Sequence, residues 1–427
     1  MKIIILLLAA AALCGAFSSC SQNANAAAKP AQEAQEAEFE TTEELMTEPA
    51  DIHLSDRQQS FVAGNNAFTL KFLKTVNDED NTSHSFVYSP LSITYALSMV
   101  NAAAQGATER ELEQTLGFGQ GGIQEVNQFC KTLIDSLPMV DRKVQLSIAN
   151  SIFVNKDYRL LKPYQTDMQR YFGALAEGLD FSSKKSLNRI NGWCNKKTNG
   201  MIPTILDELN PDAVSYLLNA IYFKAEWSNP FEKDFTNNED FATAHGAKTM
   251  PLMQQTRNYN YLKNSIFAAV DLPYGNHRWS MTVMLPEEGK TATDVINYLA
   301  QNGTSFTDDF RSRRVDLKLP RFETSSATSN LIGTMQKLGL SRVFSGSAEI
   351  PNMCNTSVFI SMMLQKARIK VDERGSEAAA VTVVMLEKSC AIQRDEPVVF
   401  HAKRPFVYLI REASTGVILF VGKFTGE

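Results

Sequence analysis

Apolar residues in the first part of the folded chain recur at the spacing of helices. One helical face is formed by Phe61, Phe68, Phe72 and Val76. Another is formed by Leu187, Ile190, Trp193 and Cys194. In the segment SPLSITYALSMV, Ser89 is placed to cap a helix whose first residue is Pro90. The pattern therefore predicts that the chain begins its folded part with helices.

Later segments change to the apolar runs and two-residue alternation typical of strands. These segments are KVQLSIANSIFV from Lys143, LLNAIYF from Leu217, MTVML from Met281, VDLKL from Val315, ARIKV from Ala367, FVYLIR from Phe406 and VILFV from Val417. The last two are joined by the turn-like EASTG. Without an internal repeat or a linker in between, residues 55–427 are predicted to form a single α+β domain with large, mostly antiparallel sheets.

The first residues, MKIIILLLAAAALCGAFSSCSQ, combine a lysine, an apolar run and small residues before Cys20. The run is too short to span a membrane, so residues 1–19 are predicted to be an export signal. Small residues directly before a cysteine resemble a bacterial lipobox, which predicts lipidation of Cys20. Phe17 stands where leucine is more usual in such sites, so plain secretion remains the alternative.

Residues 20–54 are rich in Ala, Glu, Gln and Thr and offer little apolar surface to bury. This composition predicts a disordered tether between the lipid and the domain. The expected location is the cell envelope, either at the surface or in the periplasm.

Composition and charge exclude some classes of function. The 427 residues are 44% hydrophobic and 21% charged, with a formal net charge of −5, which is typical of a folded protein and unlike a nucleic-acid binder. The short cluster Arg311, Arg313 and Arg314 is interpreted as a solvated face. The four cysteines of the domain have neither paired nor metal-ligand spacing, so no disulfide, metal or cofactor is expected. They are Cys130, Cys194, Cys354 and Cys390.

The sequence also offers little support for an enzyme. None of its histidines lies in an HExxH pattern, and no G-x-S-x-G elbow is present. The segment 416–422 with Lys423 has the wrong spacing for a phosphate loop. Only a catalytic site assembled from distant residues remains open as an enzymatic alternative.

Six motifs resemble those of the serpin family, and the match covers roughly residues 55–425. In chain order they are FVYSPLSITYALSMV, GATERELEQTLGF, NGWCNKKTNGMIP, LLNAIYFKAEWSNPF, KVDERGSEAAAVT and RPFVYLIREASTGVILFVGKF. The resemblance implies a protease inhibitor that changes shape. Its loop would be cleaved by the protease, the protease held as an acyl-enzyme, and the freed loop inserted as a new strand of the main sheet.

The resemblance assigns the hinge of this loop to Glu373, Gly375, Ser376, Glu377, Ala378, Ala379 and Ala380. In a strand, alternate side chains face opposite sides. One face would carry only uncharged residues, namely Ser376, Ala378, Ala380, Thr382, Val384 and Leu386. The other would carry both acids, Glu377 and Glu387. The alternatives are that 375–386 is already a fixed strand, or that the chain is a non-inhibitory carrier or chaperone.

The family's usual spacing places the cleaved bond sixteen residues beyond Glu373, between Ser389 and Cys390. A small residue such as Ser389 suits an elastase-like serine protease or a papain-like cysteine protease, whereas Lys388 would suit a trypsin-like one. The expected partner is thus a target protease. The chain is expected to be a monomer that contacts membranes only through its lipid.

Two further groups match regions that control opening of the sheet in the family. Ser89, Ser92 and Asn219 match a polar group beneath the sheet, where Gln365 replaces the usual histidine. Because an amide does not titrate near neutral pH, a pH trigger is not expected there. Trp227, Arg321 and Glu373 match residues at the point where the loop enters the sheet, with an ion pair expected between Arg321 and Glu373.

Overall fold

The computed structural model describes residues 51–79, 84–326, 330–376 and 396–427. Its α-helices are α1 (Asp56–Glu79), α2 (Pro90–Asn101), α3 (Gly106–Thr115), α4 (Ile123–Ser136), α5 (Lys162–Phe172), α6 (Lys184–Lys197), α7 (Ala292–Asn302) and α8 (Ile332–Lys337). The two predicted helical faces lie on α1 and α6. Most of their apolar side chains are buried, which confirms the helix-rich start.

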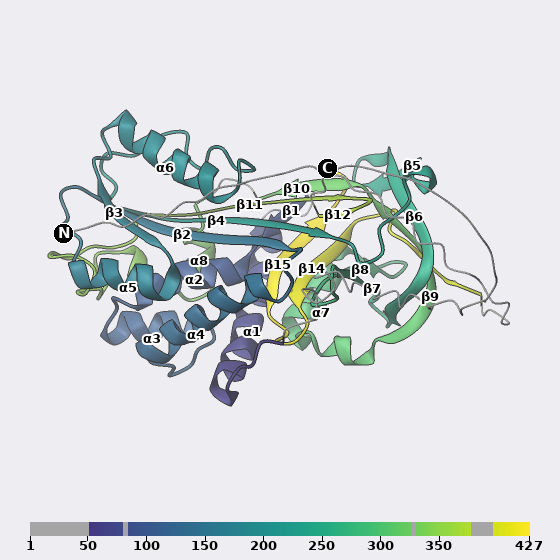
Figure 1. The fold of residues 1–427 in the computed structure, drawn as a ribbon, viewed down its shortest axis with the longest axis horizontal. Coiled ribbons are helices and arrows are strands. Elements are labelled where there is room, and N and C mark those ends of the chain that lie inside the picture. Colours follow the sequence, from purple (N-terminus) through teal and green to yellow (C-terminus); the bar gives the residue numbers. More distant parts are fainter. Residues whose placement is uncertain (1–50, 80–83, 327–329, 377–395) are drawn as a thin grey trace, which may run out of the picture. The chain divides into compact units, whose positions relative to one another are not determined.

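One sheet has six strands in the order β10-β11-β12-β4-β2-β3. Their bounds are β10 (Phe322–Ser325), β11 (Met362–Asp372), β12 (Gly375–Ser376), β4 (Ser215–Glu226), β2 (Gln145–Asn155) and β3 (Leu175–Leu179). Figure 1 shows α6 on one face of this sheet and α2 on the other. Alternate residues of β4 follow that division, because Leu218 packs with α6 residues while Leu217 belongs to the main core.

The second sheet has nine strands, ordered β1-β15-β14-β8-β7-β6-β9-β13, with β5 paired to β6. Their bounds are β1 (Phe86–Tyr88), β5 (Asn237–Thr243), β6 (Gly246–Lys263), β7 (Phe267–Tyr274), β8 (Trp279–Pro286), β9 (Arg311–Pro320), β13 (Val398–His401), β14 (Phe406–Glu412) and β15 (Ile418–Phe424). Strands β14 and β15 form the predicted hairpin. The two sheets together confirm the α+β class.

Aromatic side chains join the two sheets. Phe223 of β4 makes edge contacts with Tyr274 and Trp279, at centroid distances of 5.5 and 5.6 Å. All three rings are buried, and aromatic burial of this kind is a large contribution to core stability. This core holds β4 in place, and β12 lies against β4. In the described part of the chain, no helix has the length and apolarity needed to cross a membrane.

Candidate functional site

The site is built around β12, a strand of two residues wedged between β11 and β4. Ser376 is paired with Val371 of β11 on one side and Ala225 of β4 on the other, both antiparallel. Its buried hydroxyl lies 2.7 Å from the hydroxyl of Tyr274 in β7. The side chain of Ser376 therefore points inward, toward the nine-stranded sheet.

Beyond this wedge, β11 and β4 are direct neighbours. Residues 362–367 of β11 pair in parallel with residues 216–221 of β4. A strand lying along the full length of β11 would separate these two, because adjacent strands are only about 4.8 Å apart. Insertion of a strand between β11 and β4 would therefore have to break this pairing. Most of the segment 375–386 considered as a fixed strand lies outside the described residues.

Glu373 anchors the turn between β11 and β12. Its carboxylate is almost fully buried and accepts hydrogen bonds from Arg321 and, at 2.7 Å, from the Thr236 hydroxyl. Its main-chain carbonyl accepts from the amide of Phe231 at 2.7 Å. Burial raises the pKa of Glu373, but the hydrogen bonds from Arg321 and Thr236 outweigh it, so the pKa is lowered. The predicted ion pair is present in the structure.

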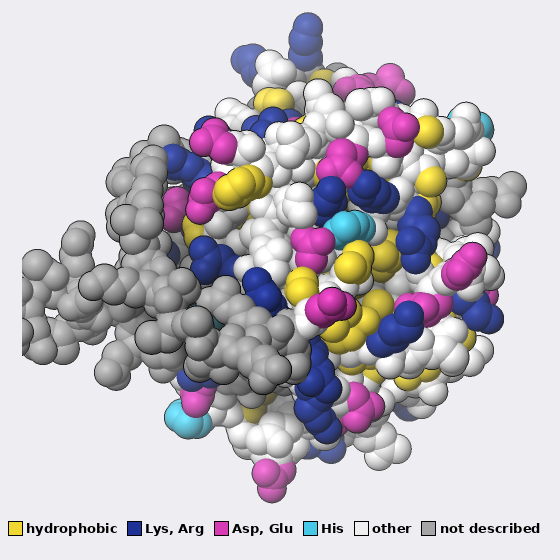
Figure 2. All heavy atoms as spheres, turned by 90° about the vertical axis from the view of Figure 1, so that its right-hand side faces the viewer, with side chains coloured by type: hydrophobic (Ala, Val, Ile, Leu, Met, Phe, Trp, Pro, Cys, Tyr) yellow, Lys and Arg dark blue, Asp and Glu magenta, His cyan; other side chains and the backbone are white. Residues whose placement is uncertain are grey.

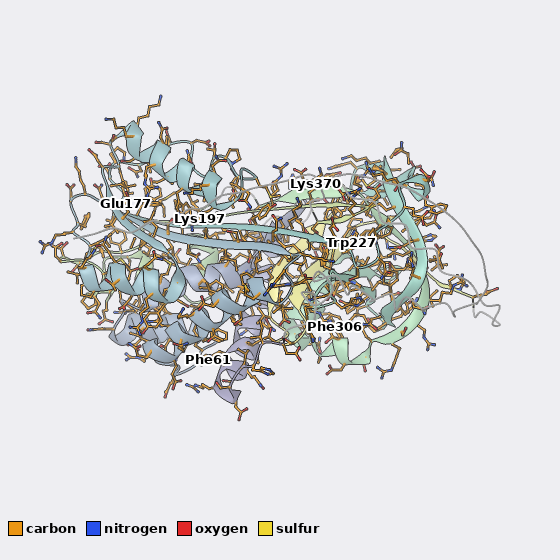
Figure 3. The ribbon with its side chains drawn as sticks, in the orientation of Figure 1. Phe61, Glu177, Lys197, Trp227, Phe306 and Lys370 are labelled. Atoms are coloured by element: carbon orange, nitrogen blue, oxygen red, sulfur yellow. The ribbon has the colours of Figure 1, made fainter. Side chains whose placement is uncertain are left out.

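Trp227 fixes the same turn from the end of β4. Its indole nitrogen donates to the carbonyl of Asp372 at 2.9 Å, and its amide donates to the carbonyl of Arg374 at 2.6 Å. The ring stacks on Tyr274 with a centroid distance of 4.3 Å and an interplanar angle of 9°. Figure 3 shows Trp227 and Lys370 toward one end of the six-stranded sheet and Glu177 toward the other. Tyr274 thus contacts both Trp227 and Ser376, a role that no local sequence pattern indicated.

A buried polar cluster lies where β11 and β4 pair directly. The Gln365 amide donates to Asn219 Oδ1 at 2.8 Å and to the Ser89 carbonyl at 2.9 Å, and it accepts from the Ser89 amide at 2.9 Å. Asn219 in turn donates to the Ser92 hydroxyl and, at 2.7 Å, to Asn150 Oδ1. The structure therefore brings together Ser89, Ser92, Asn219 and Gln365, and it adds Asn150.

The Ser89 side chain does not do what the sequence predicted. Ser89 occupies the N-cap position of α2, but its hydroxyl makes no capping hydrogen bond and is buried without a partner. Its φ and ψ of −117° and 89° lie outside the usual geometry of a cap, and its main-chain groups bind Gln365 instead. Pro90 begins the helix as predicted.

A model of the serpin family, described as serine protease inhibitor, matches residues 63–426. The chain belongs to the serpin family. At the level of the family, serpins are protease inhibitors rather than catalysts.

Relatives occur in distant organisms. A serpin-like protein of Thermococcus kodakarensis is 30% identical over 386 residues, covering 89% of this chain and 88% of its own. Iripin-2 of Ixodes ricinus is 30% identical, covering 86% and 94%. Among solved structures, the native state of the thermophilic serpin tengpin has a TM-score of 0.79 at 26% identity, covering 90% of this chain and 98% of its own. Human thyroxine-binding globulin in complex with its hormone has a TM-score of 0.75 at 26% identity, covering 86% and 98%.

Several residues assigned from the sequence lie outside the described residues. They are Cys20 of the lipobox, Glu377, Ala378, Ala379 and Ala380 of the hinge, and Lys388, Ser389 and Cys390 around the cleaved bond. The cysteines that are described, Cys130, Cys194 and Cys354, are free and buried. Burial raises the pKa of the Cys130 and Cys194 thiols to about 12, which makes them poor nucleophiles.

The part of the serpin chain that the structure describes contains no group of His, Cys, Asp and Glu able to hold a metal ion. Lys423, which lies in β15 directly after the segment 416–422 considered for phosphate binding, is buried. Its ammonium donates to Asn77 Oδ1 at 2.9 Å and lies 4.9 Å from the centre of the Phe86 ring. The side chain is thus engaged in the core.

The face near β6, β9 and β13 carries both signs of charge. Figure 2 shows basic and acidic side chains intermixed on it. Glu239 bridges Lys318 at 2.5 Å and Lys403, while Asp316 lies 2.9 Å from His401. This face of the serpin presents mixed charge to a partner instead of a single basic stripe.

The pKa of Glu373 predicts a loss of stability in acid. A carboxyl group whose pKa is lowered on folding stabilises the folded state above its unfolded pKa, near 4.3, and this contribution disappears as pH falls through the folded value. We expect the difference in unfolding free energy between the parent serpin and Glu373→Gln to be largest above about pH 5 and to shrink on acidification. Urea titrations from pH 6 to pH 3 measure it, and a difference independent of pH would contradict the prediction.

Gly375 is required by the close approach of β4. Its φ is +154°, and a Cβ atom there would lie 2.0 Å from the carbonyl oxygen of Ala225. We expect Gly375→Ala to lower the unfolding free energy by about 1–3 kcal/mol, because β12 must leave its place or distort β4. Gly346→Ala is the matched control, since a Cβ atom at Gly346 meets nothing within 4 Å. Equal urea midpoints for the two variants would contradict the assignment.

Proposed function

We propose that the chain is a suicide inhibitor of serine endopeptidases. The protease serine attacks the carbonyl of Ser389, the bond to Cys390 breaks, and the new amino terminus leaves while the acyl ester remains. The freed segment then inserts between β11 and β4. The observation that carries this proposal is that β11 and β4 pair directly with each other, while Ser376 already lies between them at one end.

Continuing the register of β12 gives each inserted residue two neighbours. The pairing is antiparallel, so a residue two positions after Ser376 lies opposite the residues two positions before Val371 and Ala225. Ala380 would reach Ala367 and Ile221, and both of these are fully buried. Small residues suit this narrow position. Thr382 would arrive between Gln365 and Asn219, whose hydrogen bond must break as the strands separate.

The opposite face of the inserted strand is matched in the same way. Glu377 would lie between two lysines, Lys370 of β11 and Lys224 of β4. Further along, Val381, Val383 and Met385 would extend the apolar cluster beneath α6, which already includes Leu218, Ala220 and Leu364. The alternation of side chains along the hinge therefore fits both faces of the slot between β11 and β4, and the charged Glu377 would lie at the solvated end of this slot.

The energy available is sufficient. Insertion replaces the single hydrogen-bond ladder between β11 and β4 with two ladders, one on each side of the new strand. About 11 inserted residues then gain one additional ladder, which contributes roughly 0.5–1.5 kcal/mol per hydrogen bond, or about 5–16 kcal/mol in total. Loss of a single donor from a protease oxyanion hole already slows its chemistry by about 10²–10³-fold. Insertion can therefore trap the acyl-enzyme if it pulls the protease active site out of shape.

The target class follows from the residues at the cleaved bond. Ser389 favours an elastase-like serine protease, with cross-inhibition of papain-like cysteine proteases. Lys388 is the alternative contact residue and would favour a trypsin-like target. We also propose that the chain acts as a monomer at the cell envelope after export, held by a lipid on Cys20. Loss of membrane association in Cys20→Ala supports the anchor, and retention contradicts it.

The test is to mix the protein with elastase, trypsin, chymotrypsin and papain and to follow both residual activity and denaturing gels. An inhibitor gives a covalent band that survives SDS with its target serine protease. Ala380→Glu should turn the inhibitor into a substrate, because it buries a charge between Ala367 and Ile221. Ala379→Glu, the matched control, would face Arg368 on the other side and should still trap. Equal behaviour of the two variants would contradict insertion in this register.

A carrier function is the second candidate, favoured by the similarity to thyroxine-binding globulin, which binds thyroxine. A carrier would be cleaved without forming the covalent band or lowering protease activity. The same gels therefore separate the two functions.

A further inference from the structure

A hollow of about 450 Å³ lies away from β12, where α7 begins and the nine-stranded sheet ends. Its apolar wall includes Pro286 at the end of β8, Ala292 at the start of α7, and Pro405 just before β14. This volume falls in the range of pockets that hold small molecules, about 300–1,000 Å³. Nothing in the inhibitory mechanism uses it.

The charged residues that line the hollow are all basic. They are Lys290, Arg404 and Lys423. Lys423 is committed to Asn77 and the Phe86 ring, as described above. Arg404 is held in place because one guanidinium nitrogen donates to the carbonyl of Pro286. Within the described residues, neither Arg404 nor Lys290 takes part in an ion pair, so both can bind an anion.

The neighbouring carboxylates are engaged elsewhere. Asp294 turns back to the start of α7, where it accepts from the Thr291 amide at 2.8 Å and from its hydroxyl at 2.7 Å. Glu287 pairs with Lys263 at 2.8 Å. Neither acid lines the hollow, so no carboxylate stands in its described wall beside Arg404 and Lys290.

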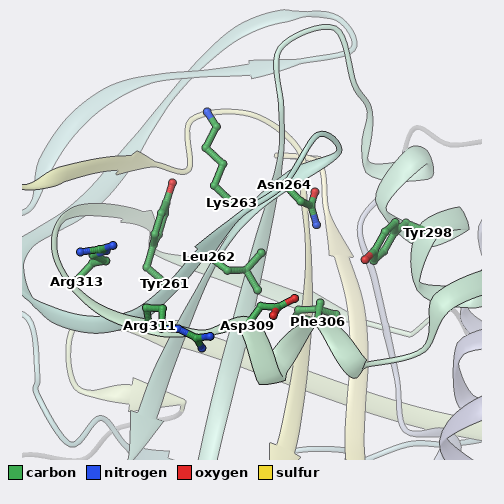
Figure 4. Close-up of a pocket in the computed structure, with 9 residues that line it drawn as sticks. All are labelled: Tyr261, Leu262, Lys263, Asn264, Tyr298, Phe306, Asp309, Arg311 and Arg313. Atoms are coloured by element: carbon green, nitrogen blue, oxygen red, sulfur yellow. The ribbon is translucent and has the colours of Figure 1, made fainter.

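A second hollow on the same sheet provides the contrast. Figure 4 shows it, with a volume of about 380 Å³ and Arg311 and Arg313 in its wall. Here Asp309 also lines the wall, and Arg311 donates to the carbonyls of Asp308 and Phe310 at 3.0 and 2.8 Å. Its positive charge is partly offset, so it serves as an internal control.

We propose that the hollow beside α7 binds a small organic carboxylate with a hydrocarbon tail. The carboxylate pairs with Arg404 and Lys290, since charge-assisted hydrogen bonds to a guanidinium are strong and directional. The tail covers the prolines and Ala292. This binding site goes beyond protease inhibition and does not depend on it.

Isothermal titration of the full chain with octanoate tests the site. We expect saturable binding of one octanoate per chain with a dissociation constant of about 1 mM or tighter. Lys290→Gln and Arg404→Gln should each weaken binding roughly tenfold, because each removes a hydrogen bond to a charged group. Octanol should bind at least about tenfold more weakly than octanoate, because it carries no charge.

The controls separate this site from general anion binding. Arg311→Gln and Arg313→Gln should leave octanoate binding unchanged, and sulfate should compete only weakly because it cannot cover the apolar wall. Lys290 is exposed, so Lys290→Gln tests the charge even if Arg404→Gln fails to fold, and Lys290→Arg should restore binding. The proposal is overturned by absence of saturable heat at 10 mM octanoate (about tenfold above the expected constant), by equal binding of octanol, or by unchanged binding in Lys290→Gln. Protease trapping is measured separately, so its failure leaves this result intact.

Discussion

Cleavage between β12 and β13 should raise the melting temperature of the protein by about 10–30 °C. The estimate converts the 5–16 kcal/mol of the added ladder at about 2 °C per kcal/mol for a domain of this size. The gain is expected because, among the described residues of the intact chain, only Gly375 and Ser376 lie between β11 and β4, whereas the cut chain can add a strand along β11.

Calorimetry of intact and nicked protein measures this gain, with the cut confirmed by mass spectrometry. The nicked form of Ala380→Glu should lose most of the gain, because its inward carboxylate would be buried without a partner. The nicked form of Ala379→Glu should keep it. If the nicked parent melts at the same temperature as the intact protein, insertion of the cleaved loop does not stabilise the fold, and the proposed mechanism is wrong.

Replacing Glu373 with lysine should destabilise the intact protein by about 3–5 kcal/mol, because it places two positive charges together at a buried position. Glu373 holds Arg321 and Thr236 on one side and Phe231 on the other, so the turn before β12 should open. An open slot can accept the loop of another copy. Native gels after mild warming should therefore show ladders.

The matched control for this prediction is Glu323→Lys. Glu323 also pairs with an arginine, Arg368, but both side chains are more than 40% exposed, and such pairs contribute only about 0–1 kcal/mol. This variant should melt within a few degrees of the parent and remain a monomer on the gels. Ladders in both variants, or in neither, would show that the burial of Glu373 is not what keeps the slot closed.

The strands predicted from the sequence are ones with continuous apolar runs or clear alternation, and β6 is among those that were missed. Segments around Leu217, Met281 and Phe406 became β4, β8 and β14. The long strand β6 was missed because GAKTMPLMQQTRNYNYLK is largely polar. It is a strand because it pairs with β9 along residues 252–261 and with β5 and β7 near its ends. This pairing is tertiary, so no local pattern indicates it.

Some residues of the site were likewise predicted from the sequence, and others were revealed only by the structure. The resemblance to serpins placed Glu373, Arg321 and Trp227 together, and the structure brings them together. It gave no indication of Tyr274, which lies 102 residues from Ser376 in the chain and meets it only because two sheets pack face to face. Ser89 was assigned as a cap from its position before Pro90, but its hydroxyl makes no cap hydrogen bond and its main chain binds the buried amide of Gln365. Side-chain roles that depend on a partner from a distant strand could not be read from local sequence.

The amide of Gln365 also sets the conditions under which the protein can operate. The side chains that hold β11 to β4 from below are hydroxyls and amides, and none of Ser89, Ser92, Asn150, Asn219 and Gln365 gains or loses a proton near neutrality. Parting the strands thus costs the same in a mildly acidic medium as in a mildly alkaline one. For a serpin that is exported and traps proteases as proposed above, the speed of capture would then depend on the protease that it meets and not on the acidity of its surroundings.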